Sequence, residues 1–143
     1  MLFQSQLKGG YSVTENTKHQ ILKTIETSKN EILSYPDYDQ LITVKTIKSN
    51  MYSFANKIEC MNAHYEEDFI NQLIRQEDFE IEYVVCVWND GSLDIPSMNF
   101  RQLLLQASEK NNHAILVMLG ENGIIGRELA SCMPICNSNS KCV

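Results

Sequence analysis

Residues 79–88 have the sequence FEIEYVVCVW, and this stretch decides the fold more clearly than any other. In its first half, apolar residues alternate with Glu80 and Glu82, which is the pattern of a strand with one solvated face. From Val84 to Trp88 every residue is apolar, so both faces of this second half need to be covered. The sequence therefore predicts a central strand with other elements packed on both sides of it.

Helices and further strands surround this central strand. Apolar residues recur at helical spacing in residues 21–33, 65–74 and 100–107, and Thr14 and Ser97 are suited to cap the first and third helix. Further strands, most of them in neighbouring pairs joined by short turns, are expected where β-branched and aromatic residues gather. They span residues 3–7, 41–48, 51–60, 93–95, 114–119 and 124–129. This order predicts an α+β fold, a mixed or mostly antiparallel sheet built from hairpins with about three helices packed on it.

The length and composition are those of one globular domain. The 143 residues are enough to bury a single core, which we place in residues 1–131, and residues 132–143 are predicted to form a flexible tail that contains cysteines. We find no signal peptide and no apolar stretch of membrane-spanning length, which predicts a cytoplasmic protein without a membrane partner. The five cysteines are then expected to be reduced thiols.

No metal site and no cofactor are predicted. Cys132, Cys136 and Cys142 are three thiols in one terminal segment, whereas structural zinc usually takes four ligands in two separated pairs. His64 and Glu66 stand two positions apart on a predicted helix, so their side chains are expected to point to different sides. Neither group of residues is therefore assigned as a ligand set.

The strongest compositional feature is an acidic block between Glu59 and Asp94. This window holds ten of the eighteen carboxylates and only one cation, Arg75, so its formal charge is −9 while the whole chain carries −6. Such a block is typical of a surface that meets a positively charged partner, which it also attracts at long range. The negative net charge argues against nucleic acid as a partner, because phosphate contacts require clustered Lys and Arg.

One hypothesis of function follows from this block. The chain would be a small acidic intracellular binding protein that inhibits or neutralises a basic protein, in the manner of bacterial toxin-immunity proteins in toxin-antitoxin pairs. The partner would be a basic protein such as a nuclease toxin, and acidic residues of the second helix and the following strand would cover its cationic active site. These residues are Glu66, Glu67, Asp68, Glu77, Asp78, Glu80 and Glu82.

The alternative hypothesis is a small-ligand binding protein for a nucleotide-like molecule, or a modest enzyme. Segment 88–101 leaves a buried strand and enters a helix, at the kind of rim that often carries ligand-binding groups. A ring would stack on Trp88, and Arg101 would bind a phosphate or carboxylate. The candidate ligand site consists of Trp88, Asp90, Ser92, Asp94 and Arg101. A hairpin turn followed by a capped helix explains the same residues without a ligand.

No catalytic residue is assigned from the sequence. Cys86 lies within an apolar run that would raise the pKa of its thiol, and the Gly-x-Ser-x-Gly motif of a serine nucleophile does not occur. A non-enzymatic role is therefore favoured, and the oligomeric state is left open.

Overall fold

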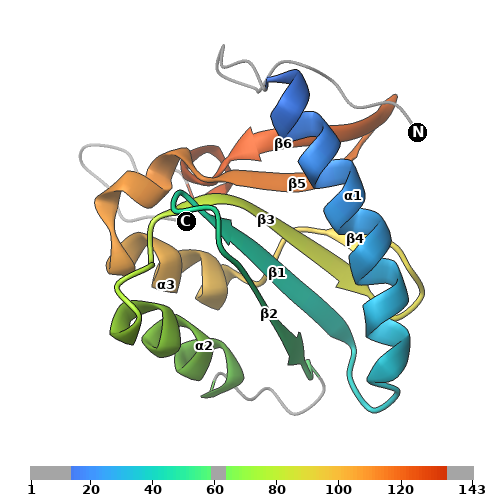
Figure 1. Cartoon of the computed structure of the whole chain (residues 1–143), viewed down its shortest axis with the longest axis horizontal. Coiled ribbons are helices and arrows are strands. Elements are labelled where there is room, and N and C mark those ends of the chain that lie inside the picture. The colour runs from blue at the N-terminus through green and yellow to red at the C-terminus, as the bar shows by residue number, and fades with distance from the viewer. Residues whose placement is uncertain (1–13, 59–63, 135–143) are drawn as a thin grey trace.

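The computed structural model describes residues 14–58 and 64–134. In this part of the chain three α-helices pack against a six-stranded mixed sheet, so the predicted α+β class is confirmed (Figure 1). The predicted strand at 3–7, the end of the predicted strand 51–60 and most of the predicted tail (135–143) lie outside the described residues. None of the helices described is both long and apolar enough to cross a membrane.

Two of the three helices described, the first and the third, begin at the capping residues that the sequence indicates. The helices are α1 (Glu15–Glu31), α2 (His64–Arg75) and α3 (Met98–Ala107). The Thr14 hydroxyl accepts a hydrogen bond from the Thr17 N–H at the start of α1, and the Ser97 hydroxyl accepts one from the Phe100 N–H at the start of α3. Each cap satisfies a backbone donor that has no partner within the helix, which fixes where the helix starts.

The central position predicted for residues 79–88 is confirmed. The strands are β1 (Gln40–Thr46), β2 (Met51–Asn56), β3 (Ile81–Trp88), β4 (Leu93–Asp94), β5 (Ile115–Gly120) and β6 (Gly123–Glu128). They lie in the order β2-β1-β3-β5-β6, and the short β4 also pairs with β3. All these pairs are antiparallel except β3 with β5, which is parallel because α3 crosses over between them.

The two faces of the sheet are covered by different helices (Figure 1). On one face Ile21 and Ile25 of α1 pack in a core cluster with Val85 of β3. On the other face Phe69 of α2 and Phe100 of α3 pack in a second cluster that includes neighbouring residues of β1 and β3. The wholly apolar half of β3 is therefore buried on both sides, as its sequence predicts.

Candidate functional site

Glu66, in the first turn of α2, is the centre of a buried polar cluster. The residue is only 4% exposed. Its carboxyl oxygens accept hydrogen bonds from Ser97 Oγ at 2.7 Å, Asn99 Nδ2 at 2.8 Å and Asn56 Nδ2 at 3.3 Å. Ser97 and Asn99 belong to the start of α3, and Asn56 ends β2. The Glu66 carboxyl group thus joins the first turns of two helices to the end of an edge strand.

A row of polar side chains crosses the sheet next to Glu66. Gln40 is the cross-strand partner of Asn56 on β2 and of Trp88 on β3. Directly opposed residues of antiparallel strands share a face of the sheet, so these three residues share the face on which Asn56 meets Glu66. Trp88 Nε1 donates a hydrogen bond to Asp94 Oδ2 at 3.2 Å, which extends the row to β4.

Gln40 carries an acceptor without a donor. The residue is 3% exposed, and its Oε1 has no hydrogen-bond partner in the part of the chain that the structure describes. Leaving a buried polar atom unpaired costs about 1 to 3 kcal/mol, so such an atom calls for an explanation. A donor supplied by a bound molecule would satisfy Gln40 Oε1 in the same row as Asn56 and Trp88.

Cys86 lies on β3, two residues before Trp88. Burial raises the pKa of its thiol, and the nearby carboxylates of Asp94 and Glu66 raise it further. The thiol is therefore protonated at neutral pH and is a poor nucleophile, as its apolar sequence context predicts. Asp94 is the cross-strand partner of Cys86 on β4.

The structure divides the candidate ligand segment 88–101 into two groups. Trp88 and Asp94 join the polar row. Asp90 and Ser92 bond to each other within the turn, where the Ser92 N–H and hydroxyl both donate to Asp90 Oδ1 at 2.9 and 2.6 Å. Arg101 donates to the backbone carbonyls of Pro96 at 3.0 Å and Ser97 at 3.4 Å, and also to that of Cys132. The Arg101 guanidinium thus ties α3 to the 3-10 turn Leu129–Cys132.

The seven acidic residues predicted to bind a partner do not form one exposed face. Glu66 and Asp78 are buried, and each accepts hydrogen bonds from neighbouring side chains that compensate its loss of water. Glu82 lies 3.0 Å from the Lys45 ammonium, and Glu80 lies 3.7 Å from that of Lys110. The remaining three residues, Glu67, Asp68 and Glu77, are exposed. None of them forms an ion pair within the residues that the structure describes.

Asp78 has a structural role at the end of α2. Its Oδ2 accepts hydrogen bonds from Asn50 Nδ2 at 2.8 Å and the Tyr52 hydroxyl at 3.0 Å. Burial by itself would raise the pKa of Asp78. The hydrogen bonds from Asn50, Thr46 and Tyr52, together with the charge of Lys48, outweigh burial and hold the pKa below its usual value of 3.8.

We expect the stability that Asp78 contributes to depend on pH. A carboxyl group whose pKa is lowered by folding stabilises the protein above its unfolded pKa, and this stability is lost as the pH falls through the folded pKa. Asp78→Asn should therefore cost about 1 kcal/mol at neutral pH and progressively less as the pH falls below 3.8. Urea unfolding of both proteins between about pH 7 and pH 2 measures this difference. If the destabilisation by Asp78→Asn did not change with pH, the lowered pKa of Asp78 in the folded protein would be contradicted.

Comparison with known proteins gives a likeness in fold. No protein-family model matches the sequence, and no curated protein matches it either. The fold is similar to the crystal structure of cytidine deaminase from Mycobacterium leprae, with a TM-score of 0.57 and 17% identity over 80% of this chain and 98% of that chain. It is also similar to a mutant cytidine deaminase from Mycobacterium tuberculosis, with a TM-score of 0.54 and 15% identity over 80% of this chain and 91% of that one.

This likeness overturns the first hypothesis of function. The prediction of a toxin-immunity-like inhibitor that neutralises a basic protein is wrong, because the two solved structures described above, to which this fold is similar, are cytidine deaminases. The predicted basic protein partner, including a nuclease toxin, is wrong for the same reason. The burial of Glu66 and Asp78 also removes two residues from the surface on which that hypothesis depended. The alternative, a small-ligand binding protein or modest enzyme, agrees better with the fold.

Proposed function

We propose that this chain binds a nucleoside-like small molecule beside Glu66 and does not carry out zinc-dependent deamination. The observation that carries the proposal is the buried Glu66 cluster next to the unpaired acceptor of Gln40. The ligand class comes from the cytidine deaminases that have a similar fold. These deaminases are similar to this chain in fold. Evidence for the class of ligand and for the reaction therefore has to come from the residues of the site.

The sequence holds a modified form of the zinc deaminase signature. Zinc deaminases bind their metal through a His/Cys/Cys set in the pattern His-x-Glu…Pro-Cys-x-x-Cys, and the Glu acts as general acid and base on a zinc-activated water. This chain has His64-Tyr65-Glu66, and later Pro96-Ser97-Met98-Asn99-Phe100, at the same spacing. The histidine, the glutamate and the proline of the pattern are present, while serine and phenylalanine stand at the two cysteine positions.

The residues at the two cysteine positions do not fit a zinc ion. The Ser97 hydroxyl caps α3 and donates to Glu66, so it takes part in the polar cluster. Phe100 is fully buried and its ring lies 5.7 Å from that of Phe54, so it belongs to the core and offers no donor atom. In the part of the chain that the structure describes, no three His, Cys, Asp or Glu side chains form a group that could hold a metal. We therefore derive no zinc-dependent step for this chain.

The remaining groups are suited to recognition. Gln40 Oε1 would accept a hydrogen bond from an amino or hydroxyl group of the ligand, which would remove its unpaired state. The partly buried indole of Trp88 offers an aromatic face, on which stacking of a base contributes about 1 to 3 kcal/mol. Glu66 holds Asn56 and the start of α3 in place around this position. A planar heterocycle with hydrogen-bonding groups on its edge matches these contacts.

Binding and metal content test the proposal together. We expect cytidine or a related nucleoside to raise the Tm, and Glu66→Gln to weaken binding about tenfold in calorimetric titration, because one carboxyl oxygen becomes a donor. Glu67→Gln is the matched control, since Glu67 is the exposed neighbour on the same helix. Purified protein should contain substoichiometric zinc, and EDTA should leave its Tm unchanged.

Different results would contradict different parts of the proposal. Stoichiometric zinc together with release of ammonia from cytidine would refute the absence of zinc-dependent deamination. Failure to bind any of the natural nucleosides and nucleobases would refute the ligand class. An equal loss of affinity in Glu66→Gln and Glu67→Gln would refute the location of the site.

A further inference from the structure

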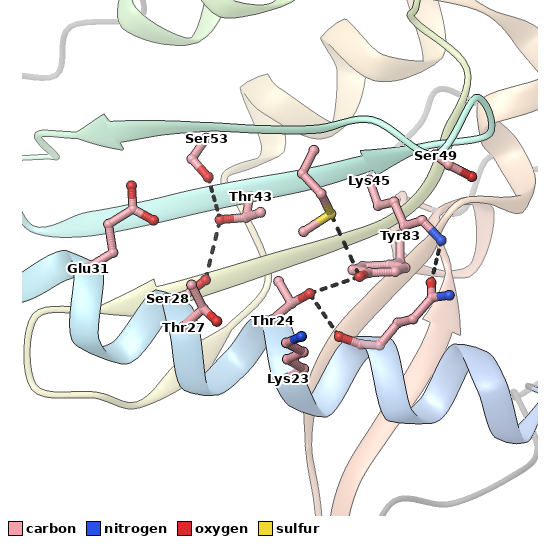
Figure 2. Close-up of a pocket in the computed structure, with 12 residues that line it drawn as sticks. Lys23, Thr24, Thr27, Ser28, Glu31, Thr43, Lys45, Ser49, Ser53 and Tyr83 are labelled. Atoms are coloured by element: carbon pink, nitrogen blue, oxygen red, sulfur yellow. Dashed lines mark hydrogen bonds between the residues drawn. The ribbon is translucent and has the colours of Figure 1, made fainter.

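A groove lies on the face of the sheet opposite the Glu66 cluster, between α1 and the strands β1 and β2 (Figure 2). Its volume is about 550 Å³, within the range of small-molecule sites in proteins. Seven of the twelve residues that line it carry a hydroxyl group, including the buried Thr24, Ser28, Thr43 and Tyr83. The proposed nucleoside site uses none of these residues.

The amphipathic pattern of α1 explains why the groove exists. Ile21 and Ile25 pack against the core of the sheet, while the neighbouring stripe of the helix carries Thr24, Thr27 and Ser28. Short polar side chains of this stripe and of the adjoining strands do not fill the space between helix and sheet. Protein interiors are otherwise close-packed, so the sequence leaves a polar space here that apolar residues of ordinary size would have filled.

The floor of the groove keeps unused hydrogen-bonding capacity. Ser28, Thr43 and Ser53 form a chain of hydroxyls with oxygen–oxygen distances of 3.3 and 2.9 Å. Three hydroxyls carry three hydrogens, and the two bonds between them use only two, so one O–H remains for a bound molecule. Figure 2 shows that these residues come from α1, β1 and β2 and point toward one another across the groove.

Tyr83 supplies the complementary acceptor. The Thr24 hydroxyl donates to the Gln20 carbonyl at 2.8 Å, so the Tyr83 hydroxyl is the donor in its 2.8 Å contact with Thr24. The same Tyr83 hydroxyl also lies 3.9 Å from Met51 Sδ, a second and weaker acceptor for its hydrogen. The Tyr83 oxygen then retains a lone pair for an incoming donor. Burial raises the pKa of Tyr83, which keeps the hydroxyl protonated at neutral pH. The groove therefore offers a donor and an acceptor, the pair that a ligand hydroxyl needs.

Charge distinguishes the two ends of the groove. Glu31 lies toward one end and Lys45 toward the other, and Lys23 lies between them on α1 (Figure 2). Lys45 is already paired with Glu82 at 3.0 Å and with the Gln20 side chain. Lys23 is exposed and forms no ion pair within the described residues, and on the helix it stands about 12 Å from Glu31. An anionic group would therefore be favoured near Lys23, away from Glu31.

We infer that this groove binds a small polyhydroxylated molecule with one anionic group, such as a sugar phosphate. The ligand hydroxyls exchange hydrogen bonds with the Ser28–Thr43–Ser53 chain and with Tyr83. The anionic group lies near Lys23. This site is separate from the proposed nucleoside site, because α1 covers one face of the sheet and α2 and α3 cover the other.

Calorimetric titration with ribose 5-phosphate tests the inference. We expect saturable binding that Lys23→Glu weakens about tenfold, whereas Lys29→Glu, the same charge change on α1 outside the groove, changes it less than about twofold. Thr43→Val removes the central hydroxyl while keeping the side-chain shape, and should weaken binding about fivefold to tenfold. Thr43 is buried, so its substitution also affects the stability of the fold, and Ser53→Phe serves as a second variant. Ser53 is exposed on an edge strand, where an aromatic residue is tolerated, and the phenylalanine ring would fill the groove.

Three outcomes would overturn the inference. They are the absence of saturable binding, binding that survives both Lys23→Glu and Ser53→Phe, and equal binding of inorganic phosphate alone, which would leave no role for the hydroxyl floor. Circular dichroism of each variant confirms that a loss of binding is not a loss of fold.

Discussion

Phe100→Ala is expected to lower the free energy of unfolding by about 3 to 5 kcal/mol, as for other fully buried aromatic residues. Phe100 is 0% exposed, and its ring centroid lies 5.7 Å from that of Phe54 and 6.2 Å from that of Phe69. Since β2, α2 and α3 meet at this ring, truncation leaves a cavity that no single element can close. Urea or guanidinium unfolding measures the effect. The slope of the unfolding free energy against denaturant concentration is compared with that of the unchanged protein.

Leu105→Ala is the control for this prediction. Leu105 is on the same helix but only partly buried, so its truncation should cost less than half as much as that of Phe100. Equal costs would mean that Phe100 is not a central core residue. The conclusion that the packing at this position leaves no room for a metal would then lose its support.

Glu66→Ala is expected to cost about 2 to 4 kcal/mol and to abolish nucleoside binding. The substitution leaves three donors, from Asn56, Ser97 and Asn99, without their common acceptor at a site where Glu66 itself is 4% exposed. It also frees the start of α3 from the start of α2. Chemical unfolding and calorimetric titration of the same variant measure the two effects.

Glu67→Ala should leave both stability and binding nearly unchanged, within about 0.5 kcal/mol, because Glu67 is exposed. A small effect of Glu66→Ala, comparable to that of Glu67→Ala, would show that the Glu66 carboxyl group does not organise the cluster. The proposed nucleoside site would then lack the residue that holds its side chains in place.

Much of the fold follows from local patterns in the sequence. The change from alternating to wholly apolar residues within 79–88 identifies the central strand, and Thr14 and Ser97 identify two helix starts. The strand predicted over 51–60 is described only as Met51–Asn56. The order of the strands across the sheet depends on which distant segments pair, such as β3 with β5, and no local pattern specifies that pairing.

The site was harder to predict because it depends on packing between distant elements. Glu66 is among the acidic residues predicted to face a partner, yet it stands three and four positions before the buried Phe69 and Ile70. Residues at this spacing share a helix face, so the sequence did contain the signal for its burial. Gln40 and Asn56 gave no such signal, since only the register of β1 and β2 brings them together.

The spacing from His64 to Glu66 and from Pro96 to Phe100 was a second signal in the sequence. Without the two cysteines, the pattern is hard to recognise before the fold is known, because no thiol pair marks it. The similarity in fold draws attention to this spacing, and the proposal of no zinc-dependent step rests on the burial of Phe100, which has no donor atom.

Fluorescence of Trp88 during titration with cytidine tests the central claim most directly. Trp88 is the only tryptophan in the chain, and it lies in the polar row beside Gln40 and Asp94. A ligand that stacks on the indole should change its emission in a saturable manner, and Glu66→Gln should shift the midpoint about tenfold. Emission that stays constant over the titration, or a saturable change with the same midpoint in Glu66→Gln, would contradict the account.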